Sequence, residues 1–174
     1  MARASDTKTR IQAVARELFL EQGMQNTSLK QIADRLGITK PALYYHFESR
    51  DDLVRSIIQP LMDDLEAFVA GREPGDGRQL LEDYFDLIWR HREVIVVVLH
   101  APAALVELNL MDRMWEWRKR LTALLLGPSP SLTAQIRATV ALGGMSDCAV
   151  EHATLPFEEV KAAAVEAALG ALTP

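Results

Sequence analysis

A short polar and aromatic stretch is the part of this sequence best suited to contact nucleic acid. Thr39, Lys40, Tyr44, Tyr45 and His46 fall within eight consecutive residues that contain no carboxylate. Such side chains can meet phosphates and reach the edges of bases in a major groove. The stretch therefore predicts a surface that faces DNA.

The residues before this stretch predict the first helix and the turn of a helix-turn-helix. Ser28 and Gln31 have the spacing of a capping box, which opens a helix that runs through Leu36. Gly37 then supplies the residue that a tight turn after a helix prefers. We expect backbone N–H groups at the Ser28 helix start to offer further donors to an anion.

The stretch itself predicts the second, recognition helix. Thr39 caps it, and Pro41 is tolerated in its first turn, where a missing N–H has no partner to lose. Leu43 and Phe47 are four residues apart and would be buried together. The other side chains of this helix would then turn outward, with Lys30 and Arg50 flanking them on phosphates.

Residues 9–53, TRIQAVARELFLEQGMQNTSLKQIADRLGITKPALYYHFESRDDL, resemble the DNA-binding domain of the TetR family of bacterial transcriptional regulators. Arg50 departs from the family, which usually has lysine there, and Pro41 stands where small residues are common. The positions that match at the family's spacing are Leu18-Phe19, Gly23, Thr27-Ser28, Ile32-Ala33, Leu36-Gly37, Leu43-Tyr44-Tyr45-His46-Phe47 and Leu53.

The resemblance implies roles for individual residues as well as an assembly. By position, Lys40, Pro41 and Tyr44 are the base-reading residues. The contacts to the DNA backbone are then assigned to Thr27, Lys30, Thr39, Tyr45, His46 and Arg50. The family likeness further implies an all-helical homodimer that binds a palindromic double-stranded operator, usually as a repressor released by a small molecule.

Hydrophobic periodicity predicts an all-α chain of eight to ten helices. We divide it into a helix-turn-helix DNA-binding domain, 1–52, and a helical ligand-binding and dimerisation domain, 53–174. Pro60 predicts a kink or a break in the helix that joins them. The run 94–99 (VIVVVL) would suit a strand or a helix, and we interpret it as a short core helix because no partner strand exists. Residues 105–126 are expected to be helical throughout.

Composition and charge bound the class of protein. The chain has 174 residues and one cysteine, so no internal disulfide can form. Residues 1–55 hold nine basic against seven acidic residues, whereas 56–174 hold ten against seventeen. This asymmetry indicates an anion-binding end on an acidic body. No apolar stretch approaches the ~20 residues that span a bilayer, so we expect a cytoplasmic protein without a membrane partner.

Two other classes of function compete with DNA binding. Ser146, Asp147, Glu151 and His152 have the residue types of a catalytic triad or a metal site, but no supporting motif surrounds them. We therefore expect no enzyme, no cofactor and no metal. The alternative is a helical protein-interaction module that uses its aromatic surface on another protein, with binding that depends little on salt.

The second half suggests an effector pocket and a dimer interface. An apolar or amphipathic small molecule is the expected effector, with His100 as a polar anchor. Trp115 and Trp117 cannot both point inward, being two residues apart on a helix. The last two helices are apolar or small around much of their circumference, which predicts that they bind a second copy. The candidate pocket residues are Tyr84, Phe85, Trp89, His100, Met111 and Trp115.

Overall fold

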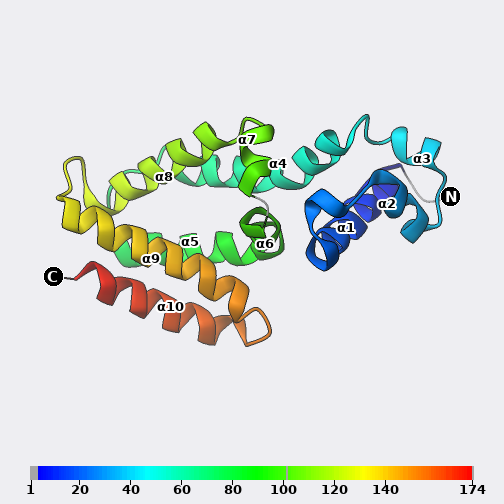
Figure 1. Ribbon diagram of the computed structural model, residues 1–174. Helices are drawn as coiled ribbons and strands as arrows, with labels where there is room; N and C mark the ends of the chain where they lie inside the picture. The colour runs from blue at the N-terminus through cyan, green and yellow to red at the C-terminus, as the bar shows by residue number, and fades with distance from the viewer. Residues whose placement is uncertain (1–3, 101, 174) are drawn as a thin grey trace. The chain divides into compact units, whose positions relative to one another are not determined.

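The computed structural model describes residues 4–100 and 102–173, and this part of the chain is helical, without a strand (Figure 1). The all-α fold class is confirmed, with ten α-helices and one 3-10 turn. In chain order they are α1 (Ala4–Gln22), η1 (Met24–Asn26), α2 (Leu29–Leu36), α3 (Lys40–Tyr44), α4 (Arg50–Val69), α5 (Gly77–Arg90), α6 (Arg92–His100), α7 (Pro102–Glu107), α8 (Met111–Leu126), α9 (Leu132–Glu151) and α10 (Phe157–Leu172).

The described residues divide into two compact units. One contains those of Met1–Pro60 and Val96–Leu110, and the other contains those of Leu61–Ile95 and Met111–Pro174. The functional boundary that we place between residues 52 and 53 lies within α4 and stays a prediction. None of the described helices is long and apolar enough to cross a membrane.

The first unit packs α1, α2 and α3 around one apolar core. On α1 the buried positions follow the 3.6-residue period that the sequence shows, because only one face of that helix meets the others. α3 contributes Leu43, which is fully buried, and Phe47 follows from the turn after it. The other buried side chains of this core include Ile11, Ala15, Leu18, Phe19, Met24, Leu29, Ile32, Ala33, Leu53, Val54, Ile57 and Ile58.

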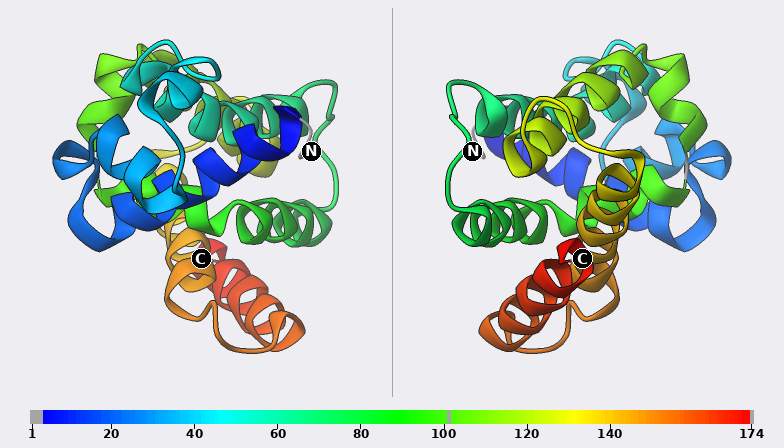
Figure 2. Two further views of the ribbon diagram at one scale, coloured as in Figure 1. Left: turned by 90° about the vertical axis from the view of Figure 1, so that its right-hand side faces the viewer. Right: turned by 90° about the vertical axis from the view of Figure 1, so that its left-hand side faces the viewer.

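The second unit has α9 and α10 as a helical hairpin, with α5 packed against both (Figure 2). Small side chains at the contact, such as Ala138 and Ala164, are buried and allow the two helices to approach closely. An aromatic cluster closes the end where α10 begins, since Phe157 lies 6.2 Å from Phe85 and 5.4 Å from Trp89, measured between ring centroids.

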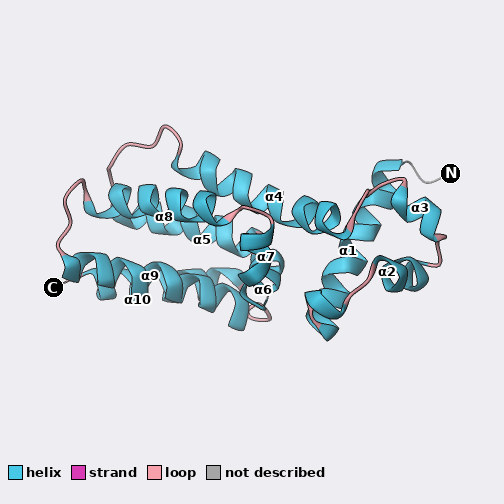
Figure 3. Cartoon of the chain, turned by 45° about the horizontal axis from the view of Figure 1, so that its top comes forward, coloured by secondary structure: helices cyan, strands magenta, loops and turns pink. Residues whose placement is uncertain are grey.

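One local prediction is confirmed and another is wrong. The ambiguous run 94–99 lies in helix α6. Residues 105–126, however, are not one helix, because α7 ends at Glu107 and α8 begins at Met111 (Figure 3). Asn109 takes a left-handed φ of 55° between them. Asparagine tolerates this conformation better than most residues, but apolar periodicity carries no signal for it.

Pro60 lies inside α4 without breaking it, so the alternative of a break is wrong. A proline has no N–H, and the carbonyl four residues earlier, that of Ser56, therefore lacks its usual helical donor. Gln12 on α1 supplies a replacement. Its Nε2 donates to the Ser56 carbonyl at 3.3 Å and to the Ser56 hydroxyl at 3.0 Å.

We expect Gln12→Ala to lower the free energy of unfolding by about 1 kcal/mol, because it leaves the Ser56 carbonyl unpaired. In a Pro60→Ala background the same substitution should cost less, since residue 60 then provides the helical N–H itself. Denaturant unfolding of the four proteins in this double-mutant cycle measures the difference. Equal costs in the two backgrounds would show that Gln12 does not compensate for the proline.

Candidate nucleic-acid interface

The turn between α2 and α3 has the geometry that its sequence predicts. The Ser28 backbone N–H donates to Gln31 Oε1 at 2.8 Å, and the Gln31 N–H donates to Ser28 Oγ at 3.3 Å, so the capping box is complete. At the other end Gly37 has a φ of 67°, and the Ile38 N–H donates to the Ala33 carbonyl at 3.0 Å. These bonds end α2 and direct the chain into α3.

Helix α3 is only five residues long, and its two sides differ sharply. Thr39 Oγ1 accepts from the Ala42 N–H at 3.3 Å, which caps the helix as expected. Leu43 is buried, whereas Tyr44 is 43% exposed and Tyr45, just past the helix, is 81% exposed. The side chains of Thr39, Lys40 and Pro41 are also exposed, and that of His46 is half-buried.

Half of the predicted DNA-binding residues share one hollow in the first unit. It has a volume of about 380 Å³ and includes one carboxylate, Glu48, which the sequence reasoning did not single out. The Lys40 ammonium stands 5.5 Å from the centroid of the Tyr44 ring. The remaining lining comprises Ser28, Leu29, Lys30, Ser49 and Arg50. Thr27, Thr39, Pro41, Tyr45 and His46 are not part of this lining.

Arg50 is directed partly into its own domain. Its Nη2 donates to the carbonyl of Met24, so the start of α4 is tied to η1. Its Nε is buried and has no hydrogen-bond partner in the described part of the chain. The residue that was expected to flank DNA therefore also holds the turn that precedes α2.

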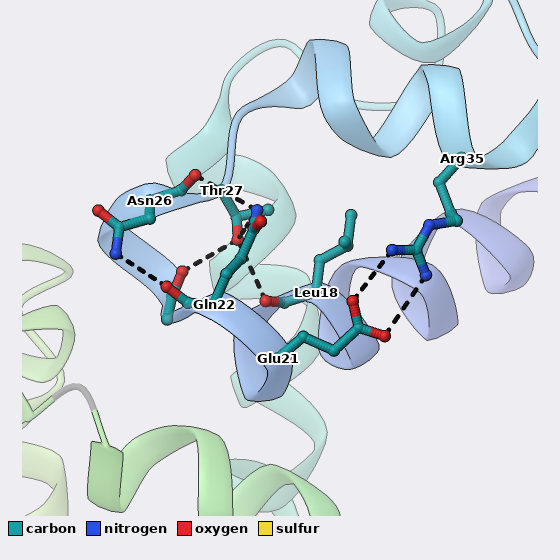
Figure 4. A network of polar contacts seen from close by, with 7 residues as sticks. Leu18, Glu21, Gln22, Asn26, Thr27 and Arg35 are labelled. Atoms are coloured by element: carbon teal, nitrogen blue, oxygen red, sulfur yellow. Dashed lines mark hydrogen bonds and ion pairs between the residues drawn. The ribbon is translucent and has the colours of Figure 1, made fainter.

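Thr27 lies inside the domain, in a network that joins η1 to α1 (Figure 4). Its hydroxyl donates toward the carbonyls of Gly23, at 2.9 Å, and Leu18, at 3.3 Å, and Gln22 Nε2 donates to it at 3.1 Å. Asn26 completes the network through its bond to the Gln22 carbonyl. This geometry gives Thr27 a structural role, and its side chain does not reach the outer surface.

An ion pair links α2 to α1 beside this network. Arg35 Nη2 lies 3.0 Å from Glu21 Oε2, and Nη1 lies 3.4 Å from Oε1 (Figure 4). The hydrogen bond that it donates to the Glu21 carboxylate raises the pKa of the Arg35 guanidinium. Because both side chains are exposed, water screens the pair, which orients the helices more than it stabilises them.

The predicted effector-pocket residues lie in different surroundings, and two of them are part of the core. Tyr84 and Phe85 are buried, and burial raises the pKa of the Tyr84 phenol. Trp89 is half-buried, with its ring tilted against that of Phe157, and Met111 is half-buried at the start of α8. Trp115 is exposed while Trp117 is buried, which confirms that the two do not both point inward. His100 ends α6, and its side chain lies outside the described residues.

Two grooves in the second unit could hold a small molecule. The α4/α8 groove, of about 710 Å³, contains Trp117 and is crossed by Arg113, whose Nε lies 2.6 Å from Glu66 Oε1 and whose Nη2 lies 3.1 Å from Asp63 Oδ1. The hydrogen bond between Arg113 and Glu66 raises the pKa of the Arg113 guanidinium and lowers that of the Glu66 carboxyl. The α8/α9 groove, of about 500 Å³, contains Trp115, Arg118 and Lys119.

Sequence reasoning missed Arg118 and Lys119. Their spacing from Trp115 could have indicated them, since residues three and four places further along a helix lie on the same face.

The residue types of a catalytic triad do not assemble, because Ser146 Oγ bonds Tyr84 and the Leu142 carbonyl, and His152 is the C-cap of α9. Burial raises the pKa of the Cys148 thiol, which lowers its reactivity. No cluster of metal-ligating side chains occurs among the described residues.

Comparison with known proteins points to one family. Residues 11–57 match the model of bacterial regulatory proteins, tetR family. The HTH-type transcriptional regulator UidR of Escherichia coli (strain K12) is 40% identical over 74 residues, which are 42% of this chain and 37% of that protein. The chain thus spans well under half the length of this curated relative.

Two solved structures resemble the whole fold. NalD, the secondary repressor of the MexAB-OprM multidrug efflux pump in Pseudomonas aeruginosa, aligns with a TM-score of 0.66 at 20% identity, over 97% of this chain and 98% of that one. SmeT in complex with triclosan aligns with a TM-score of 0.59 at 22% identity, over 95% of this chain and 90% of that one. At such identities the likeness concerns the fold alone.

The placement of Thr27 predicts the effect of removing its hydroxyl. Thr27→Val replaces the hydroxyl by a methyl group and leaves the Gly23 and Leu18 carbonyls without this donor, so the free energy of unfolding should fall by about 1–3 kcal/mol. Denaturant unfolding measures this loss, and a gel shift of the folded variant should show DNA binding unchanged. Normal stability combined with weakened DNA binding would instead indicate a direct contact.

Proposed function

We propose that this chain is a DNA-binding transcriptional regulator of the TetR family of bacterial regulatory proteins, because residues 11–57 match the model of that family. As a homodimer it binds a palindromic operator, acts as a repressor and is released by a small molecule. It works in the cytoplasm, where that operator is accessible. The observation that carries the proposal is the gathering of Lys30, Lys40, Tyr44 and Arg50 around one hollow of a helix-turn-helix.

The exposed side of α3 is the part that reads DNA. Lys40, Pro41 and Tyr44 contact bases, since their side chains are exposed whereas that of Leu43 is buried. The Lys40 ammonium beside the Tyr44 ring lets the two side chains enter the groove as one unit. Contacts with phosphates position the helix, and they come from Ser28, Lys30, Thr39, Tyr45, His46 and Arg50.

The second copy covers the outer face of α9. Leu132, Ile136 and Val140 are exposed, and their spacing of four residues makes one apolar stripe along the helix. On α10 the exposed Ala162 and Ala163 are small enough for another helix to approach closely. A palindromic site requires the two recognition helices of a two-fold dimer to lie about 34 Å apart, one turn of DNA.

The effector acts through the helices that line the grooves of the second unit. α4 carries Arg50 at its start and Asp63 and Glu66 in the α4/α8 groove. A ligand that repacks α8 disturbs the ion pairs between Arg113 and these acids, and with them the position of α4. The operator is released only if the ligand prefers the repacked state.

We expect Tyr44→Ala to reduce discrimination between operator and unrelated DNA by roughly tenfold or more, because a base contact is worth about 1–3 kcal/mol. Lys40→Ala should weaken operator binding as well. Gel shifts on the DNA directly upstream of the protein's own gene, with excess competitor at two salt concentrations, measure both effects. Arg90→Ala, which removes an exposed cation from α5, is the matched control.

Salt separates this function from protein interaction. Binding through phosphates weakens steeply as salt rises, whereas an aromatic surface on another protein depends little on it. If genome-wide selection yielded no preferred DNA site for the folded protein, the regulator function would be excluded.

The dimer face is tested with two valines of nearly equal exposure. Val140 on α9 is 62% exposed, and Val106 on α7 is 60% exposed. Val140→Asp should lower the dimer fraction and weaken operator binding, because a carboxylate would be buried at the subunit contact. Val106→Asp should change neither. Sedimentation at several concentrations measures the dimer fraction, and equal behaviour of the two variants would place the interface elsewhere.

A further inference from the structure

The α8/α9 groove has side chains of one charge only. On α8, Trp115, Arg118, Lys119 and Thr122 lie on one face at spacings of three and four residues. Gln135 and Thr139 line it from α9, and the loop that begins at Gly127 lines it between the two helices. Its volume of about 500 Å³ is within the range of pockets that hold drug-sized ligands.

The two cations of this groove have no counter-charge among the residues that the structure describes. No carboxylate lines the groove, and neither Arg118 nor Lys119 makes an ion pair with any described residue. The α4/α8 groove is different, since Arg113 pairs with two acids and Arg120 pairs with Glu116 at 3.1 Å. Two unpaired neighbouring cations repel one another, and an anion placed between them removes that repulsion.

The neutral polar side chains of the groove are already engaged. Thr122 donates to the Arg118 carbonyl at 2.9 Å, and Thr139 donates to the Gln135 carbonyl at 3.0 Å. Gln135 Nε2 donates to the Pro130 carbonyl at 3.0 Å. These bonds leave the guanidinium of Arg118 and the ammonium of Lys119 as donors for a ligand.

The remainder of the groove is apolar. Trp115 is 61% exposed and presents a large ring beside the cations, and Ala123 and Pro128 continue the apolar wall. Arg118 is half-buried, which reduces the screening of its charge by water. The groove thus combines a cationic end with an apolar surface.

We propose that the α8/α9 groove binds an anionic amphiphile, with its carboxylate or sulfonate at Arg118 and Lys119 and its apolar body against Trp115. This names the chemical class of the effector and, in that respect, rests on the proposed regulatory function. The binding itself does not depend on DNA and is tested without it.

The test is calorimetric titration of the full-length protein with decanoate below its micelle concentration. Decyltrimethylammonium, which has the same chain length and the opposite charge, is titrated in parallel, as is the aromatic sulfonate 1-anilinonaphthalene-8-sulfonate. We expect saturable binding of at least one anion. Arg118→Gln should weaken it by about tenfold, the worth of one charge-assisted hydrogen bond, and Trp115→Ala should weaken it as well.

Arg120→Gln is the matched control, because it removes one cation from the same helix but from the other groove. It should bind the anions as the unsubstituted protein does, and thermal unfolding verifies that both glutamine variants are folded. The proposal is overturned if neither anion binds, if the two variants lose affinity equally, or if decyltrimethylammonium binds as tightly as decanoate.

A gel shift on the operator with the anion that binds separates this proposal from the regulatory function. Release of the operator supports both. If the anion binds and Arg118→Gln weakens that binding, but the operator is not released, the ligand site is supported and its role as the effector site is refuted. Failure to find an operator refutes the regulatory function alone, since calorimetry decides the ligand site.

Discussion

The burial of Leu43 and Phe47 is the constraint on which the candidate interface depends. Helix α3 has five residues, and a helix of that length has no stability of its own in water. Its geometry is therefore set by what it packs against and by how the chain enters it. Gly37 in the left-handed region and the Thr39 cap fix the entry, and the two buried side chains fix the rotation about the helix axis. Tyr44 is turned outward because Leu43 is held inward, so the surface offered to DNA is a consequence of the core beneath it.

The 3-10 turn η1 is held from two sides, and this positions the start of α2. Thr27 ties it to α1 through the Gly23 and Leu18 carbonyls, and Arg50 ties it to the start of α4 through the Met24 carbonyl. Ser28, the cap of α2, follows Thr27 directly. A change in the position of α4 would therefore reach the helix-turn-helix through Arg50 as well as through the apolar core. The family that the sequence resembles usually has a lysine at this position. A lysine would lack the planar guanidinium with which Arg50 both bonds the Met24 carbonyl and lines the hollow.

Local signals predicted local structure well, and distant contacts escaped them. The capping box at Ser28, the turn at Gly37 and the helical state of 94–99 follow from residue type and spacing within a few positions. The partners of Thr27, Arg50 and Gln12 are mostly backbone carbonyls, which every residue carries, so no pattern of side chains marks them. The aromatic residues on α5 were expected to lie near a ligand, but Phe85 and Trp89 pack against Phe157 of the last helix. Periodicity identifies the face of a helix that is buried, but it does not identify the group that packs against that face. It therefore could not show that the grooves contain Trp115 and Trp117 and not Trp89.

Helix α8 presents opposite electrostatic situations on two sides. Arg113, Glu116 and Arg120 share the side toward α4, where each arginine has an acidic partner. Arg118 and Lys119, on the side toward α9, have no such partner in the described part of the chain. Their spacing produces this division, because residues five apart differ by about 140° around the axis. The same helix therefore carries arginines that are paired with acids on one side and cations that are open to a ligand on the other. A ligand that shifts α8 relative to α9 must also alter the geometry at Arg113, whose acidic partners lie on α4. The shift favours one state only to the extent that the gain at the open cations exceeds the loss at the paired ones.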